Sequence, residues 1–137
     1  MDGCLYHYRN NAQSMTAAFD PHLTETIFIP LDILRTYFDT DKRALFAQYQ
    51  MYAAYLLQLW VRNQASLDCD LDRKGLRQSC ARVCQNQELR ALLASVPGAL
   101  PRQVAVAVRA VQQQKPGQLY LLIKAWNLYY KLRNGRA

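Results

Sequence analysis

The feature that most constrains the fold is an uncharged stretch that runs from position 44 to position 61. Large apolar and aromatic side chains recur in it at steps of three or four, which is the spacing of one face of an α-helix. These positions are Leu45, Tyr49, Tyr52, Leu56 and Trp60. The pattern predicts one long helix over about residues 40–64, with Asp39 or Thr40 as its N-cap. Such a helix needs other elements to cover its apolar face, so we expect it at the centre of a helical core.

Two alternatives remain for this stretch. Its length is close to the minimum for a membrane span, but three glutamines interrupt it and three tyrosines would lie near the bilayer centre. Its aromatic face is also broad enough for a protein interface, including one between copies of the chain. We expect a core helix and no membrane association, with protein partners or a homo-oligomer on the aromatic face as the alternative.

The residues before this stretch predict a short helix. Pro30 suits the first turn of a helix. Apolar residues follow it at helical spacing, at Leu31, Leu34 and Phe38. The preceding segment, Thr24–Ile29, has the residue types of a short strand, although a single strand forms no sheet.

Four more helices are expected in the second half of the chain. The acidic run 68–72 (DCDLD) places negative charge at the start of one, and Asn86 suits the N-cap of the next. Pro101 opens a third, and the fourth runs from about Gln118 to Arg133, with Gly135 as its C-terminal cap. The expected breaks are Val96-Pro97-Gly98 and Lys115-Pro116-Gly117. The residues expected to face inward are Leu76, Cys80, Val83, Cys84, Leu89, Leu92, Leu93, Val104, Val108, Val111, Leu119, Leu122, Ile123, Trp126 and Tyr130.

Length and composition then set the fold class. A chain of 137 residues that is 51% hydrophobic can form one core and is too apolar for global disorder. We expect an all-α fold: one compact, bundle-like domain of five or six helices over residues 24–137, preceded by an irregular, flexible segment, residues 1–23. That segment lacks the pattern of a secretory signal, so we expect a cytoplasmic protein with reduced cysteines.

Charge is distributed unevenly along the chain. Residues 1–70 hold five Lys/Arg against eight Asp/Glu, a net charge of −3. Residues 71–137 hold twelve Lys/Arg against two Asp/Glu, a net charge of +10. Such a basic half repels itself unless an anionic partner or salt neutralises it. Nucleic acid is the commonest partner of this kind, followed by acidic protein surfaces and lipid headgroups.

The basic residues fall into three stripes at helical spacing. Lysine and arginine neutralise phosphates and release counterions, while asparagine and tyrosine add hydrogen bonds or stack on unpaired bases. An ordinary solvated face is the alternative, but its charges are usually of mixed sign. The residues predicted to contact nucleic acid are Lys74, Arg77, Arg82, Arg102, Arg109, Tyr120, Lys124, Asn127, Lys131 and Arg133.

Metal and catalytic sites find little support. The acidic run is spaced like the start of a Ca²⁺ loop, but Arg73 and Ser79 stand where that loop needs Gly and Glu. The cysteines form no C-x-x-C and have no neighbouring histidine. No nucleotide-binding, hydrolase or metalloprotease motif occurs. We therefore expect no metal, no cofactor and no enzymatic activity.

These observations predict a non-catalytic protein that binds the backbone of DNA or RNA, as a small or accessory subunit of a larger nucleoprotein assembly. Its basic half would face the phosphates, and its acidic half would face solvent or protein. The alternative is a protein–protein adaptor whose basic half docks on an acidic partner, and an enzyme fragment comes third. The salt dependence of binding to nucleic acid of random sequence separates the first two.

Overall fold

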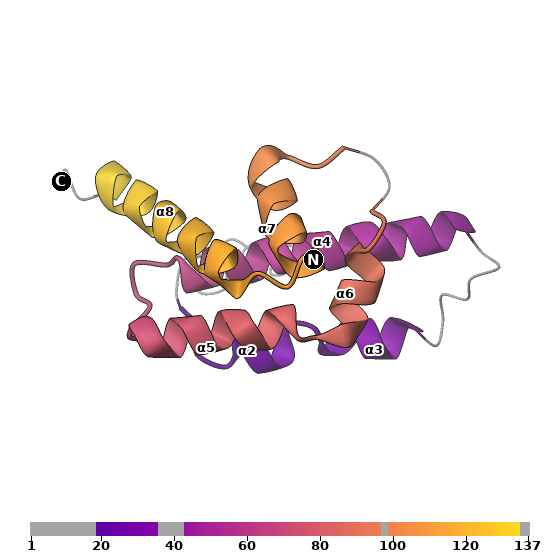
Figure 1. Ribbon diagram of the computed structural model, residues 1–137, viewed down its shortest axis with the longest axis horizontal. Coiled ribbons are helices and arrows are strands. Elements are labelled where there is room, and N and C mark those ends of the chain that lie inside the picture. Colours follow the sequence, from indigo (N-terminus) through magenta and orange to yellow (C-terminus); the bar gives the residue numbers. More distant parts are fainter. Residues whose placement is uncertain (1–18, 36–42, 97–98, 135–137) are drawn as a thin grey trace, which may run out of the picture.

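The computed structural model of the chain describes residues 19–35, 43–96 and 99–134. These residues form helices and no strand, which confirms the all-α, bundle-like prediction (Figure 1). The helices are α2 (Leu23–Thr26), α3 (Ile29–Arg35), α4 (Arg43–Gln64), α5 (Arg73–Cys84), α6 (Gln87–Leu93), α7 (Arg102–Gln112) and α8 (Pro116–Asn134). Six of these helices have seven residues or more, and α2 is a single turn.

The long helix α4 is the centre of the core. It lies along the long axis of the molecule and packs against α2, α6, α7 and α8 (Figure 1). Tyr49, Leu56 and Trp60 are buried, as expected for a core helix. Tyr52 is 36% exposed, which corrects its assignment to the inward face. The buried face passes instead through Ala53, one residue and about 100° further round the helix.

No helix among the described residues is long and apolar enough to cross a bilayer. Two polar side chains of α4 are hydrogen-bonded inside the protein. The Tyr49 hydroxyl donates a hydrogen bond to the Leu31 carbonyl, and the Trp60 indole donates one to Thr24 Oγ1 over 2.9 Å. These two bonds tie the first helices to α4. The backbone of Leu23–Thr26 forms helix α2, and α3 begins at Ile29, so the strand suggested for Thr24–Ile29 is wrong.

Two predicted helix starts are confirmed by their caps. Asp72, the last residue of the acidic run, accepts a hydrogen bond from the Gly75 amide over 2.7 Å at the start of α5. Asn86 accepts one from the Leu89 amide over 3.0 Å at the start of α6. The apolar residues predicted to face inward on α5, α6 and α7 are all buried. On α8, Leu119 and Ile123 are buried, and Leu122, Trp126 and Tyr130 are partly buried.

The turn between α7 and α8 lies slightly earlier than predicted. α7 ends at Gln112 and α8 begins at Pro116, so the proline opens the last helix instead of breaking the chain. Proline suits both places because its fixed φ fits the first helical turn. Several expectations lie outside the described residues: the flexible segment up to residue 18, the cap at Asp39 or Thr40, the Pro97-Gly98 break and the cap at Gly135.

Candidate nucleic-acid interface

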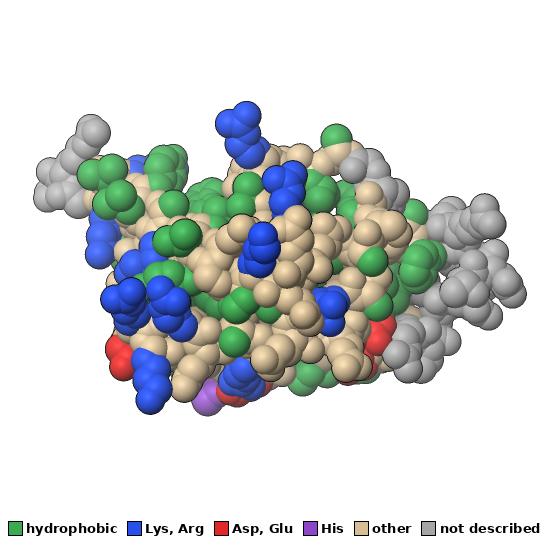
Figure 2. All heavy atoms as spheres, in the orientation of Figure 1, with side chains coloured by type: hydrophobic (Ala, Val, Ile, Leu, Met, Phe, Trp, Pro, Cys, Tyr) green, Lys and Arg blue, Asp and Glu red, His purple; other side chains and the backbone are tan. Residues whose placement is uncertain are grey.

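Lysine and arginine side chains gather at the end of the molecule where α4 ends, α5 begins and the second half of α8 projects (Figure 2). Helices α5 and α8 pack against each other there, and the Arg77 guanidinium lies over the Tyr120 ring at 4.5 Å. We call this region the basic end. Among the described residues, its cations are Arg62, Arg73, Lys74, Arg77, Lys124, Lys131 and Arg133.

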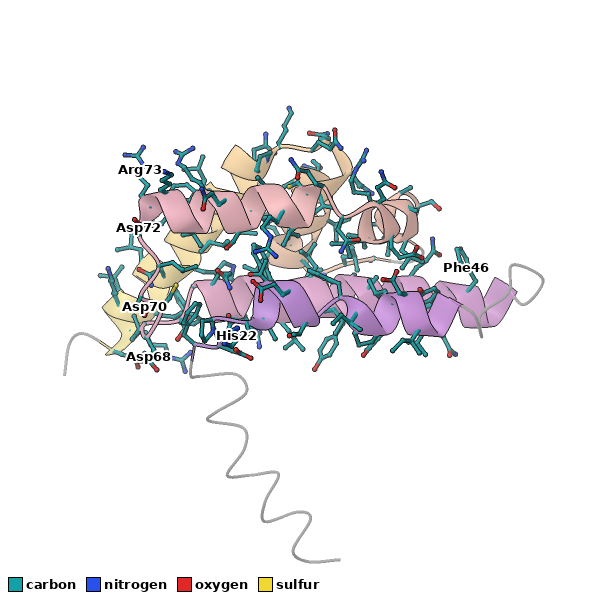
Figure 3. All side chains as sticks on the ribbon, turned by 90° about the horizontal axis from the view of Figure 1, so that it is seen from below. His22, Phe46, Asp68, Asp70, Asp72 and Arg73 are labelled. Carbon is teal, nitrogen blue, oxygen red and sulfur yellow. The ribbon has the colours of Figure 1, made fainter. Side chains whose placement is uncertain are left out.

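The loop between α4 and α5 brings acids to the same end. Asp68, Asp70 and Asp72 are seen there, with Arg73 next to them (Figure 3). Asp72 is engaged as the cap of α5. Seven cations against these three carboxylates leave the basic end with a net charge of +4. The local field therefore favours an anionic partner, although it is weaker than the sequence of the second half suggests.

An open groove of about 560 Å³ follows one side of α8. Three of its aromatic rings form a cluster: the Trp126 centroid is 5.5 Å from that of Tyr130 and 5.9 Å from that of Tyr129. The Arg62 guanidinium carbon is 5.9 Å from the Trp126 centroid. We call this the aromatic groove. It is lined by Arg62, Gln103, Leu122, Ala125, Trp126, Tyr129, Tyr130 and Arg133.

The chemistry of the aromatic groove suits a flat ring next to an anion. Aromatic faces stack on nucleobases, and arginine provides both charge and directed N–H groups. The Nε of Arg62 is buried and has no hydrogen-bond partner in the part of the chain that the structure describes. Arg133 lines the same groove. The groove therefore combines a stacking surface with two cations.

A smaller recess of about 160 Å³ lies on the other side of α8. Lys124 and Lys131 come from α8, and Gln64 comes from the end of α4. Asn127 is anchored at this recess because its amide nitrogen donates to the Ala65 carbonyl over 3.0 Å. We call this the lysine recess. It is lined by Gln64, Leu67, Cys69, Leu76, Ile123, Lys124, Asn127 and Lys131.

Five of the ten residues predicted from sequence are cations of the basic end, and Asn127 lines the lysine recess next to two of them. The five cations are Lys74, Arg77, Lys124, Lys131 and Arg133. Arg102 and Arg109 are exposed on α7 and line neither the aromatic groove nor the lysine recess. Arg82 is exposed and pairs with Glu25 at 3.3 Å, which ties α5 to α2 and offsets the charge of this arginine.

Tyr120 and Asn127 do not lie on the surface in the way that the sequence suggested. Tyr120 is only 8% exposed and Arg77 covers its ring, so it supports Arg77 and offers no free face to a base. Asn127 is half-buried, and its amide nitrogen bonds the backbone. Both residues lie on the face of α8 that runs from Tyr120 to Lys131. This face is buried at Tyr120 and exposed at Lys131, because the second half of α8 projects from the body of the protein.

Sequence reasoning missed Arg62 and Gln64 and assigned Trp126 to the core. Arg62 belongs to the half of the chain with a net negative charge, so the charge pattern gave no reason to select it. Trp126 does follow the inward spacing of α8, but it is partly buried and its ring lines the aromatic groove. Only the long-range pairing of α4 with α8 brings these side chains together.

The three thiols in the described part of the chain have raised pKa values, which does not favour nucleophilic chemistry. Burial raises the pKa of Cys80 to about 12 and that of Cys84 to about 11. Burial also raises the pKa of Cys69. All three are free thiols. Within the described ranges, no group of three or more His, Cys, Asp or Glu side chains is placed to hold a metal ion.

No family model, curated protein or solved structure is significantly similar to this chain. The function is therefore inferred from its residues and their arrangement.

Proposed function

We propose that this protein binds the phosphate backbone of nucleic acid through its basic end, without catalysis, as a small or accessory subunit of a nucleoprotein assembly. The observation that carries the proposal is the gathering of seven cations from α4, α5 and α8 at one end of the molecule. Residues far apart in sequence supply them, so the concentration of charge is a property of the fold. Each phosphate that they neutralise releases counterions and favours binding.

The aromatic groove supports a preference for unpaired bases. Bases inside a duplex are already stacked on their neighbours, whereas a single strand offers free faces to Trp126, Tyr129 and Tyr130. Stacking of one base on an aromatic side chain contributes about 1–3 kcal/mol. Arg62 and Arg133 would contact the phosphates next to the stacked base. We therefore expect single strands to bind more tightly than duplexes of the same length.

The experiment is a titration of labelled random-sequence oligonucleotides, single-stranded and duplex, over a range of salt concentrations. The logarithm of the binding constant should fall linearly with the logarithm of the salt concentration. Trp126→Ala should reduce the preference for single strands but keep the salt dependence, because it removes a stacking ring and no charge. Absence of binding at low salt would contradict the proposal.

A second candidate function is that of an adaptor for an acidic protein. Leu121, Leu128 and Leu132 are each more than half exposed and follow one stripe of α8, at spacings of seven and four residues. An amphipathic helix with acidic flanks would match this stripe and the cations beside it. Leu128→Glu separates the two functions, because it should abolish docking of such a helix but leave the phosphate contacts in place.

A further inference from the structure

The lysine recess has one property that surface lysines alone do not provide. Its lining includes Gln64, a residue that is only 2% exposed and carries a side-chain amide. The position assigned to the oxygen of this amide is buried, and that oxygen has no hydrogen-bond partner among the described residues. A buried polar atom without a partner costs about 1–3 kcal/mol, so its presence points to a ligand or water in the recess.

The orientation of Asn63, the preceding residue, decides which atom of the Gln64 amide it does not contact. Asn63 faces the backbone of Asp20, and both groups are satisfied when its oxygen accepts from Asp20 N–H over 2.8 Å and its nitrogen donates to Asp20 C=O over 3.1 Å. In the opposite orientation, Asn63 Oδ1 accepts from Gln64 Nε2 over 3.0 Å, and the contacts with Asp20 are lost. The first orientation is favoured because it makes two backbone hydrogen bonds.

The first orientation fixes Gln64 as well. The Asn63 nitrogen then lies 3.0 Å from the nearest Gln64 amide atom, which has to be the Gln64 oxygen to accept a hydrogen bond. The Gln64 nitrogen takes the other position, which is buried and has no hydrogen-bond donor within reach among the described residues. The recess therefore holds an N–H donor at a buried position, together with the ammonium groups of Lys124 and Lys131. No Asp or Glu lines it.

We propose that the lysine recess binds one phosphate group, with the Gln64 amide as the buried donor and Lys124 and Lys131 as the cations. A recess of about 160 Å³ is large enough for a tetrahedral anion. The phosphate can come from a nucleic-acid backbone or from a small phosphate compound. If the phosphate belongs to a nucleic-acid backbone, the recess rests on the proposed function and adds a fixed phosphate contact on the opposite side of α8 from the aromatic groove. If it belongs to a small phosphate compound, the recess is independent of that function.

The test uses inorganic phosphate as the probe and the full chain as the protein. Phosphate at tens of millimolar should raise the thermal unfolding midpoint more than chloride of equal ionic strength does, because a ligand that binds only the folded state stabilises it. The side-chain amide signal of Gln64 in a nitrogen–proton NMR spectrum should shift at the same phosphate concentrations. This signal reports on the recess itself.

Variants of the recess sharpen the test. Gln64→Glu keeps the shape but replaces the donor by a negative charge, and it should abolish the phosphate effect. Lys131→Ala changes an exposed side chain, so it keeps the fold and should weaken phosphate binding about tenfold, the expected loss of one charge-assisted hydrogen bond. Lys115→Ala is the matched control, because Lys115 is an exposed cation in the turn before α8 and does not line the recess. It should bind phosphate like the parent.

An oligonucleotide arm separates this inference from the proposed function. If a single strand and phosphate compete, and Lys131→Ala weakens the binding of each, the phosphate site and the proposed function are both supported. Phosphate binding without oligonucleotide binding would support the recess and contradict the proposed function. Oligonucleotide binding without any phosphate-specific effect in the parent would overturn the recess and leave the proposed function standing. Equal phosphate binding by the parent and Lys131→Ala would also overturn it.

Discussion

Gln114 shows how one residue ends a helix in this protein. Its φ of 51° lies in the left-handed region, where the Cβ atom of an L-residue is crowded. The Gln114 amide donates to Val111 C=O over 3.1 Å, and the Lys115 amide donates to Ala110 C=O over 2.9 Å. These two bonds form the Schellman motif, in which glycine is the usual residue at this position. The chain has glutamine there, so the turn carries backbone strain.

Gln114→Gly should therefore increase the free energy of unfolding by about 1 kcal/mol, because glycine adopts positive φ without a steric cost. Urea denaturation of the parent and the variant measures this difference. Gln113→Gly is the matched control, since Gln113 is next in sequence, is also exposed and has an ordinary φ of −91°. It should not stabilise the protein. Equal effects of the two substitutions would show that the turn is unstrained.

The cysteines give a second prediction at this scale. Burial raises the pKa of Cys80 and Cys84 above the ordinary value of 9.0, so the unfolded chain loses these protons first as the pH rises. The free energy of unfolding should then fall from about pH 9 up to pH 11–12, which are the pKa values of the folded state. Because tyrosines and lysines titrate in the same range, the measurement is the difference between the parent and Cys80→Ala/Cys84→Ala. Identical slopes in the two proteins would contradict burial of the thiols.

At the scale of elements, α8 combines a buried end with an exposed one. Leu119 and Ile123 are fully buried, whereas Leu128 is 56% exposed. The helix packs against α5 and α7, and it carries the aromatic groove on one side and the lysine recess on the other. The core thus anchors one end of the helix that carries the candidate contact residues.

Two alanine substitutions on this helix test that division. Ile123→Ala should destabilise the protein by about 2–5 kcal/mol, because it leaves a cavity in the core. Leu128→Ala should change the free energy of unfolding by less than about 0.5 kcal/mol, because the side chain is exposed. Thermal unfolding followed by circular dichroism measures both. Comparable losses would place Leu128 in an interface that is formed in solution.

Local sequence signals predicted most of the elements. The helical spacing of apolar residues and the cap at Asn86 were sufficient for α6, since both act within a few residues of the chain. The same signals could not place Tyr120 beneath Arg77, or pair Arg82 with Glu25, because these contacts join helices whose packing the sequence does not specify. The sequence placed five predicted contact residues on α5 and α8. It could not show that they share the basic end, because that depends on how the two helices pack.

At the scale of the whole molecule, we expect nucleic-acid binding to depend more on where the Lys and Arg side chains lie than on the net charge of the protein. Charge counting assigned the basic residues of α5, α7 and α8 equally to a nucleic-acid partner. The exposed arginines of α7 line neither the aromatic groove nor the lysine recess. If the basic end is the contact surface, two variants with the same change in net charge should therefore behave differently.

The most direct measurement compares the salt dependence of single-strand binding for Lys124→Glu/Lys131→Glu and Arg102→Glu/Arg109→Glu. All four side chains are exposed, so both variants should fold like the parent by circular dichroism. For the lysine pair, the slope of log binding constant against log salt should become shallower by up to about 1.4, or about 0.7 for each lost phosphate contact. The arginine pair should keep a slope close to that of the parent. Equal losses in the two variants would contradict the account, because binding would then follow net charge and not the basic end.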